Sequence, residues 1–156
     1  MSSSEPAGYE LPVRLLAAFR TVIDDLHAGL ATVGHPDARP VHAFALQALG
    51  PDGASASELA RRLGVSKQAA AKHVQALERL GYVERVDDPA DARSRMVRPT
   101  ARGGDLITAS ADIFQALRAR WVEQLGETSL ARLLDSLAAL ASTDSLRTDV
   151  LGWLGT

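Results

Sequence analysis

The stretch VSKQAAAKHVQALERLGYVER, Val65 to Arg85, joins a predicted helix to a predicted strand. Apolar side chains recur along one side of the helix, at Ala70, Val74 and Leu77. Polar side chains recur along the other side, at Gln68, Lys72, Gln75 and Arg79. An ordinary amphipathic helix followed by a hairpin fits this pattern, and so does a helix that lies in a DNA groove. The flanking residues distinguish the two interpretations.

A short helix is predicted immediately before this stretch. Ser55 and Glu58 have the S-x-x-E spacing of a capping box, in which hydroxyl and carboxylate each satisfy a free backbone N–H. The helix ends at Gly64 after barely two turns, so it must pack on another element to be stable. Ser66 caps the next helix, which runs to about Leu80.

A charged hairpin is predicted after that helix. Residues 82–86 and 95–98 have the period-2 pattern of strands, and residues 87–91 form the turn between them. Pro99 suits the end of an edge strand because it cannot donate to a ladder. Short helix, Gly turn, helix and hairpin is the order of a winged helix-turn-helix, in which the second helix enters the major groove of DNA.

The remaining predicted elements are helices on either side of this unit. They cover about residues 11–33, 40–49, 100–125 and 128–141, with a final turn or two from Asp144 to Trp153. The predicted fold is therefore mainly α with a small β-hairpin wing. The first and last helices are rich in Leu, Val and Ile, and their apolar stripes need covering on so small a protomer.

Charge is distributed unevenly along the 156 residues, whose net charge is −2. Residues 55–103 hold ten Lys or Arg and six Asp or Glu, whereas the rest of the chain is acidic. A locally basic surface is enough for DNA binding through counterion release. The chain has no cysteine, which excludes disulfides and thiol chemistry.

The run from Ser57 to Gly103 resembles the winged helix-turn-helix of the MarR family of bacterial regulators. Residues 91–94 match that family's D-x-R-S wing signature, and residues 100–103 match its T-x-x-G helix start. Pro99 departs from the aliphatic residue that is usual there. The resemblance implies a homodimeric transcriptional regulator, usually a repressor, that binds a pseudo-palindromic site on double-stranded DNA.

The same resemblance implies a division of the chain and a set of contacts. Residues 9–36 and 104–156 would form a helical dimerisation region, and residues 37–103 the DNA-binding lobe. The major groove would be met by Ser66, Lys67, Gln68, Lys72 and His73, with Gln75 on the polar face of the same helix. Arg93 and Arg95 of the hairpin would meet the minor groove or phosphates, and Arg61 and Arg62 are phosphate candidates. Asp91 would orient the wing rather than touch DNA.

Many members of the family release DNA when a small aromatic or phenolic compound binds between the two regions. Residues that could line such a cavity, or that could simply form the core, are Phe19, Ile23, His42, Phe44, Phe114 and Trp121. The four histidines have no metal-ligand spacing, so we expect neither a metal site nor a cofactor.

Two other functions compete with DNA binding. A winged helix can serve as a protein-interaction module without sequence-specific DNA binding, with its basic stripe facing an acidic partner. An enzyme is less favoured, because no G-x-S-x-G motif or phosphate loop is present. No apolar run reaches the roughly 18 residues of a membrane span and the start lacks a secretory signal, so we expect a cytoplasmic protein without a membrane partner.

Overall fold

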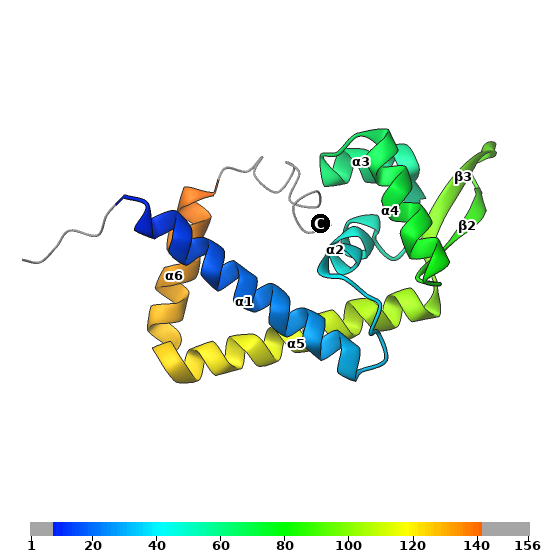
Figure 1. The fold of residues 1–156 in the computed structure, drawn as a ribbon. Helices are drawn as coiled ribbons and strands as arrows, with labels where there is room; N and C mark the ends of the chain where they lie inside the picture. Colours follow the sequence, from blue (N-terminus) through cyan, green and yellow to red (C-terminus); the bar gives the residue numbers. More distant parts are fainter. Residues whose placement is uncertain (1–7, 142–156) are drawn as a thin grey trace, which may run out of the picture.

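The computed structural model describes residues 8–141, so the turns predicted from Asp144 to Trp153 lie outside the described residues. Three long helices form one part of the molecule: α1 (Glu10–Thr32), α5 (Ala101–Leu125) and α6 (Glu127–Leu140). In Figure 1, α5 runs from beneath the lobe toward α6, and α1 lies alongside it. Within residues 8–141, no helix combines the length and the apolar character that crossing a membrane requires.

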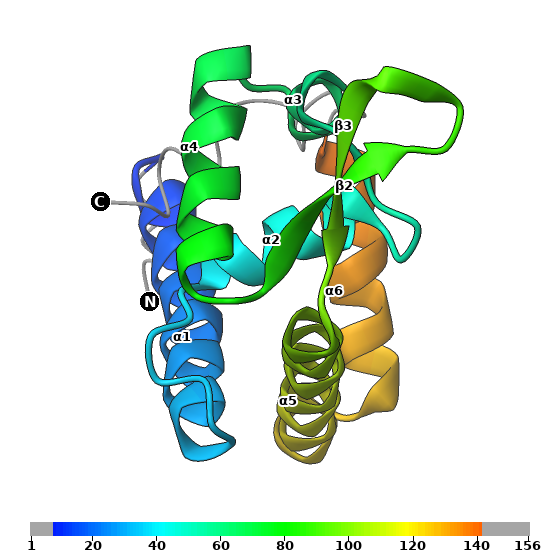
Figure 2. The ribbon, with the colours of Figure 1, turned by 90° about the vertical axis from the view of Figure 1, so that its right-hand side faces the viewer.

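The other part of the molecule is a lobe with a projecting hairpin. Its helices are α2 (Pro40–Leu49), α3 (Ala56–Leu63) and α4 (Lys67–Arg79). Its strands are β1 (Ala54–Ser55), β2 (Val83–Asp88) and β3 (Asp91–Pro99), which form an antiparallel sheet in the order β1-β3-β2. Figure 2 shows the β2–β3 hairpin extending to one side of the helices, and Figure 1 shows it next to α4. The predicted fold class, mainly α with a small hairpin wing, is confirmed.

Hydroxyl caps begin three of the helices, including those predicted at Ser55 and Ser66. Ser66 Oγ accepts from the N–H of Ala69 at 3.1 Å, and Thr100 Oγ1 accepts from the N–H of Gly103 at 3.2 Å. Ser55 Oγ accepts from the N–H of Glu58 at 3.1 Å. The reciprocal half of the predicted capping box is absent, because the Glu58 carboxylate accepts from arginines of α3 instead.

The sheet differs from the predicted hairpin in two respects. The strands extend to Asp88 and from Asp91, so the turn is shorter than the predicted residues 87–91. A third strand, β1, pairs with β3 at Val97 and Met96, which makes β3 the central strand rather than an edge strand. The β1 pairing ends at Val97, so the missing N–H of Pro99 removes no bond to β1.

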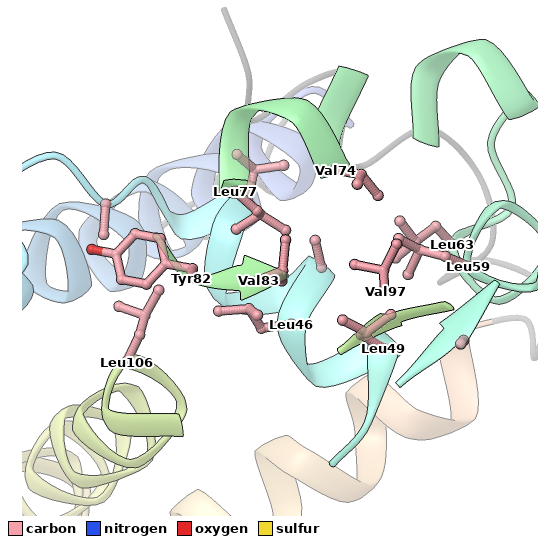
Figure 3. Close-up of a cluster of buried hydrophobic side chains, with 14 of the residues drawn as sticks. Leu46, Leu49, Leu59, Leu63, Val74, Leu77, Tyr82, Val83, Val97 and Leu106 are labelled. Carbon is pink, nitrogen blue, oxygen red and sulfur yellow. The ribbon is translucent and has the colours of Figure 1, made fainter. Parts of the chain in front are cut away.

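The hydrophobic core lies where the lobe meets α1 and α5. Figure 3 shows side chains from every lobe helix, from the wing strands and from α5 converging on one cluster. Its fully buried members include Leu26, Leu30, Leu46, Leu49, Leu59, Val74, Leu77, Tyr82, Val97 and Leu106. Because α4 contributes one face to this cluster, the core fixes which face of α4 points outward.

Apolar side chains also remain exposed on a single protomer, as predicted for the first and last helices. They lie along the first half of α1, at the end of α5 and along α6: Leu11, Val13, Leu15, Leu16, Phe19, Leu125, Leu133, Leu134, Leu137 and Leu140. Exposed apolar patches of this kind mark surfaces at which a protein binds another molecule.

Candidate nucleic-acid interface

Helix α4 carries its apolar and polar side chains on opposite faces. Ala70, Val74 and Leu77 are buried. The exposed side chains are Lys67, Gln68, Lys72, Gln75 and Arg79, with Ser66 exposed at the N-cap. The apolar face therefore packs α4 into the lobe, while the polar face is accessible to a partner as large as double-stranded DNA.

The turn between α3 and α4 sets the angle at which α4 is presented. Gly64 has a φ of 67°, in the left-handed region that favours glycine. The N–H of Val65 then donates to Ala60 O at 3.0 Å, which closes the end of α3. The predicted arrangement of two helices around a glycine turn is confirmed.

The two arginines of α3 have different surroundings. Arg62 Nη1 donates to Ala48 O at 3.0 Å and to Leu49 O at 2.9 Å, so it closes the C-terminal end of α2. Its Nη2 donates to the Glu58 carboxylate at 2.7 Å. Arg61 is exposed and has only a 3.5 Å contact with the same carboxylate. Arg61 is therefore the better placed of the two to contact a phosphate.

The wing is ordered by its own acidic residues. Asp91 Oδ1 accepts from the N–H of Arg93 at 3.0 Å, so Asp91 orients the wing backbone as expected. Across the strands, Arg98 donates to Glu84 at 2.8 Å, and Arg95 Nε lies 3.7 Å from Asp87 Oδ1.

A further ion pair connects the wing to α4. Arg85 Nε on β2 donates to both carboxylate oxygens of Glu78 on α4, at 3.2 Å each. Most arginines of the wing strands are thus neutralised internally. Within the described part of the chain, the cations of α4 and the wing that form no ion pair are Lys67, Lys72, Arg79 and Arg93. The surplus positive charge of the segment is concentrated at these positions.

His73 lies apart from the polar face of α4. It is half-buried, and it lines a hollow of about 430 Å³ between α2 and α4 together with His42. Burial lowers the pKa of His73, so the neutral ring is favoured. His73 is therefore less well placed for a DNA contact than the exposed side chains of α4.

His42 belongs to the N-terminal end of α2. Its Nδ1 accepts from the N–H of Arg39 at 3.0 Å. Burial, and then the charges of Arg39 and His73, lower the pKa of His42 to about 4. The side chain therefore acts as a neutral hydrogen-bond acceptor for the helix end.

The six residues predicted to line an effector cavity have unlike surroundings. Phe19 and Phe44 are exposed, whereas Ile23, Phe114 and Trp121 are partly buried. The hollow between α2 and α4 brings His42 together with charged residues such as Arg79, rather than with these five apolar side chains. An effector cavity built from the six stays a prediction.

These elements define a winged helix-turn-helix: a short helix, a glycine turn, a second helix with an exposed polar face, and then a β-hairpin.

Among residues 8–141, no group of three or more His, Cys, Asp or Glu side chains is placed to hold a metal ion.

Comparison with known proteins identifies the kind of winged helix. Residues 39–94 match the model of the MarR family. A MarR family transcription regulator, SP03579, is 25% identical with a TM-score of 0.70, over 85% of this chain and 86% of that one. FabT from Streptococcus pneumoniae, solved in complex with DNA, is 20% identical with a TM-score of 0.73, over 86% and 94%. CouR from Rhodococcus jostii RHA1, solved bound to p-coumaroyl-CoA, is 21% identical with a TM-score of 0.66, over 89% and 97%. No curated protein sequence matches.

Residues 39–94 thus match the MarR family, and the fold of residues 8–141 is similar to that of MarR-family transcription regulators. Members of this family are transcription regulators and not enzymes, in agreement with the prediction that the chain is not an enzyme.

Proposed function

We propose that this chain is a sequence-specific transcription regulator that binds a pseudo-palindromic DNA site as a homodimer. The exposed face of α4 carries the proposal. Lys67 and Lys72 form no ion pair with any described residue, and Gln68 lies on the same exposed face. Gln bonds adenine with two hydrogen bonds, and Lys reaches guanine or a phosphate. Arg93 of the wing would contact the adjacent minor groove or its phosphates.

The homodimer is supported by the apolar side chains that one protomer leaves exposed. Leu16 on α1 and Leu134 on α6 are each 49% exposed, and Leu140 is 76% exposed. Pairing of two such surfaces by a two-fold axis would remove them from water and would place two α4 helices on one side of the dimer. Size measurement by analytical ultracentrifugation should give twice the mass of the chain.

We also propose that the regulator is a repressor relieved by a small aromatic effector. The complex of the similar fold of CouR with p-coumaroyl-CoA motivates the effector class. A ligand relieves repression only if it binds the DNA-free conformation more tightly than the bound one. Titration of a preformed protein–DNA complex with aromatic acids and their coenzyme A thioesters tests this point.

The DNA-binding proposal is tested by selection from a random duplex pool. We expect enrichment of a pseudo-palindrome that the protein binds far more tightly than scrambled DNA, with affinity falling steeply as salt rises. Charge reversal of Lys72 and Arg93 should abolish this binding. If wild-type protein enriches no sequence at low salt, yet the same reversal abolishes capture of an acidic partner protein, the chain is an interaction module instead.

A further inference from the structure

Three segments that are distant in the sequence meet around the side chain of Tyr82. Tyr82 is fully buried, and its hydroxyl lies 3.0 Å from Nδ1 of His35, which is only 5% exposed. His35 comes from the α1–α2 loop and Tyr82 from the α4–β2 turn. The guanidinium of Arg102, the second residue of α5, lies 4.9 Å from the centre of the tyrosine ring.

Arg102 bonds to both neighbouring segments. Its Nε donates to Leu80 O at 3.2 Å, at the end of α4. Its Nη2 lies 3.5 Å from Gly34 O in the α1–α2 loop and 3.5 Å from the Tyr82 hydroxyl. One side chain therefore connects the start of α5 to the end of α4 and to the loop after α1.

The start of α5 is also seated directly against the turn that follows α4. Thr100 Oγ1 donates to Gly81 O at 2.6 Å. A Cβ on Gly103 would lie 2.1 Å from Tyr82 O, so only glycine permits this approach. These contacts set the position of the helix start, and the bonds of Arg102 add a constraint on its direction.

The direction of α5 matters because this helix is long. Its 25 residues span about 37 Å at 1.5 Å per residue. Figure 1 shows that it runs from the lobe to the region of α6. A rotation of about 5° at its start would displace its far end by about 3 Å, which is close to the roughly 3.4 Å rise of one base pair.

We propose that Arg102, with Tyr82 and His35, is a positioning residue for DNA recognition: it holds α4 at a fixed angle to α5 and thereby sets the half-site spacing that the dimer accepts. The inference rests on the proposed function, in which α5 and α6 belong to the dimer region. It assigns no DNA contact to Arg102.

The test uses the full-length dimer and the palindrome selected by wild-type protein, with spacers altered by one or two base pairs. Arg102→Met removes the bonds while keeping an unbranched side chain, and Arg102→Lys restores the charge. Tyr82→Phe keeps the ring and removes only the hydroxyl, as a second variant less prone to misfold. Arg20→Met is the matched control, since Arg20 is exposed and its ion pair with Asp24, at 3.9 Å, lies within α1 and joins no two elements.

We expect Arg102→Met to bind the selected spacing roughly 2- to 30-fold more weakly and to lose less on altered spacers, so that the spacing profile flattens. Tyr82→Phe should flatten it in the same direction, Arg102→Lys should recover part of the profile, and Arg20→Met should match wild type. The dependence on salt should not change, because no phosphate contact is lost.

Two results would overturn the inference while leaving the proposed function intact. One is an unchanged spacing profile in folded Arg102→Met and Tyr82→Phe dimers. The other is equal weakening at every spacing with a shallower salt dependence, which would make Arg102 a phosphate contact. If wild-type protein itself showed no spacing preference, the proposed function would fail and the inference with it.

Discussion

Replacing Arg93 with Ala should make DNA binding less sensitive to salt. Arg93 lies in the wing, is exposed, and forms no ion pair with any described residue, whereas Arg98 on the same strand is neutralised by Glu84. A protein cation that neutralises a phosphate releases counterions from the DNA. The slope of log affinity against log salt concentration therefore reports how many phosphates the protein neutralises.

The expected magnitude comes from the unpaired cations near the proposed contact surface. If Lys67, Lys72 and Arg93 each neutralise one phosphate, a dimer neutralises about six, and the slope is about −5.4. Arg93→Ala removes two of these contacts and should bring the slope to about −3.6. If wild type and variant bind equally at about 1 M salt, this difference in slope makes the variant bind about 30-fold more weakly at roughly 0.15 M salt.

Fluorescence anisotropy of the selected duplex over a range of salt concentrations measures the slope. Arg132→Ala is the matched control, because Arg132 is an exposed arginine of α6 without an ion pair to a described residue and lies outside the lobe. Its slope should equal that of wild type. An unchanged slope for Arg93→Ala, or an equal change for Arg132→Ala, would refute the role given to the wing.

Gln68→Ala should cost about 1–3 kcal/mol on the selected DNA and much less on scrambled DNA, as competition binding would show; equal losses on both would mean that Gln68 reads no base. In urea unfolding, Gly103→Ala should destabilise the fold by about 1–3 kcal/mol, because its Cβ would lie 2.1 Å from a carbonyl oxygen. Gly104→Ala should instead stabilise it by about 0.5–1 kcal/mol, since nothing lies within 4 Å of that position; the reverse order would contradict the packing described here. Because the pKa of His42 falls from 6.5 to about 4 on folding, its contribution to stability should be present above pH 6.5 and be lost as pH falls toward 4. The loss should amount to at most about 3 kcal/mol, and less where solvent screens the charge. His42→Gln, which keeps an acceptor for the N–H of Arg39, should remove this part of the pH dependence, and an identical profile for both proteins would count against the assignment.

Helix boundaries could be predicted from the sequence because their signals are local. The hydroxyls of Ser66 and Thr100 each accept a hydrogen bond from the N–H three residues farther on, and Gly64 adopts the left-handed backbone conformation that glycine favours. The two faces of α4 follow from a helical period within one segment. No tertiary information is needed for any of these features.

Features that depend on distant segments could not be predicted. Strand β1 has two residues and exists only because Val97 and Met96 of β3 lie beside it. The charges along the sequence indicate that the middle of the chain is basic. They do not indicate that Arg62 donates to carbonyl oxygens of α2, or that Lys72 forms no ion pair with a described residue. The sequence likewise predicts a DNA-binding surface from Arg61 to Arg95, and which of these side chains touch DNA stays a prediction.

The residue Ser55 belongs to two structures at once. Its backbone is in β1, paired with Met96 of the wing strand β3, and its hydroxyl caps α3. Ser55 therefore joins the wing strand directly to the start of α3, and we expect this link to hold the wing and the helix pair in one relative orientation. On the proposed DNA site, α4 could then contact the major groove and the wing the adjacent minor groove only when the DNA has one particular helical twist. Affinity should then respond to DNA supercoiling, which changes twist while leaving every base in place.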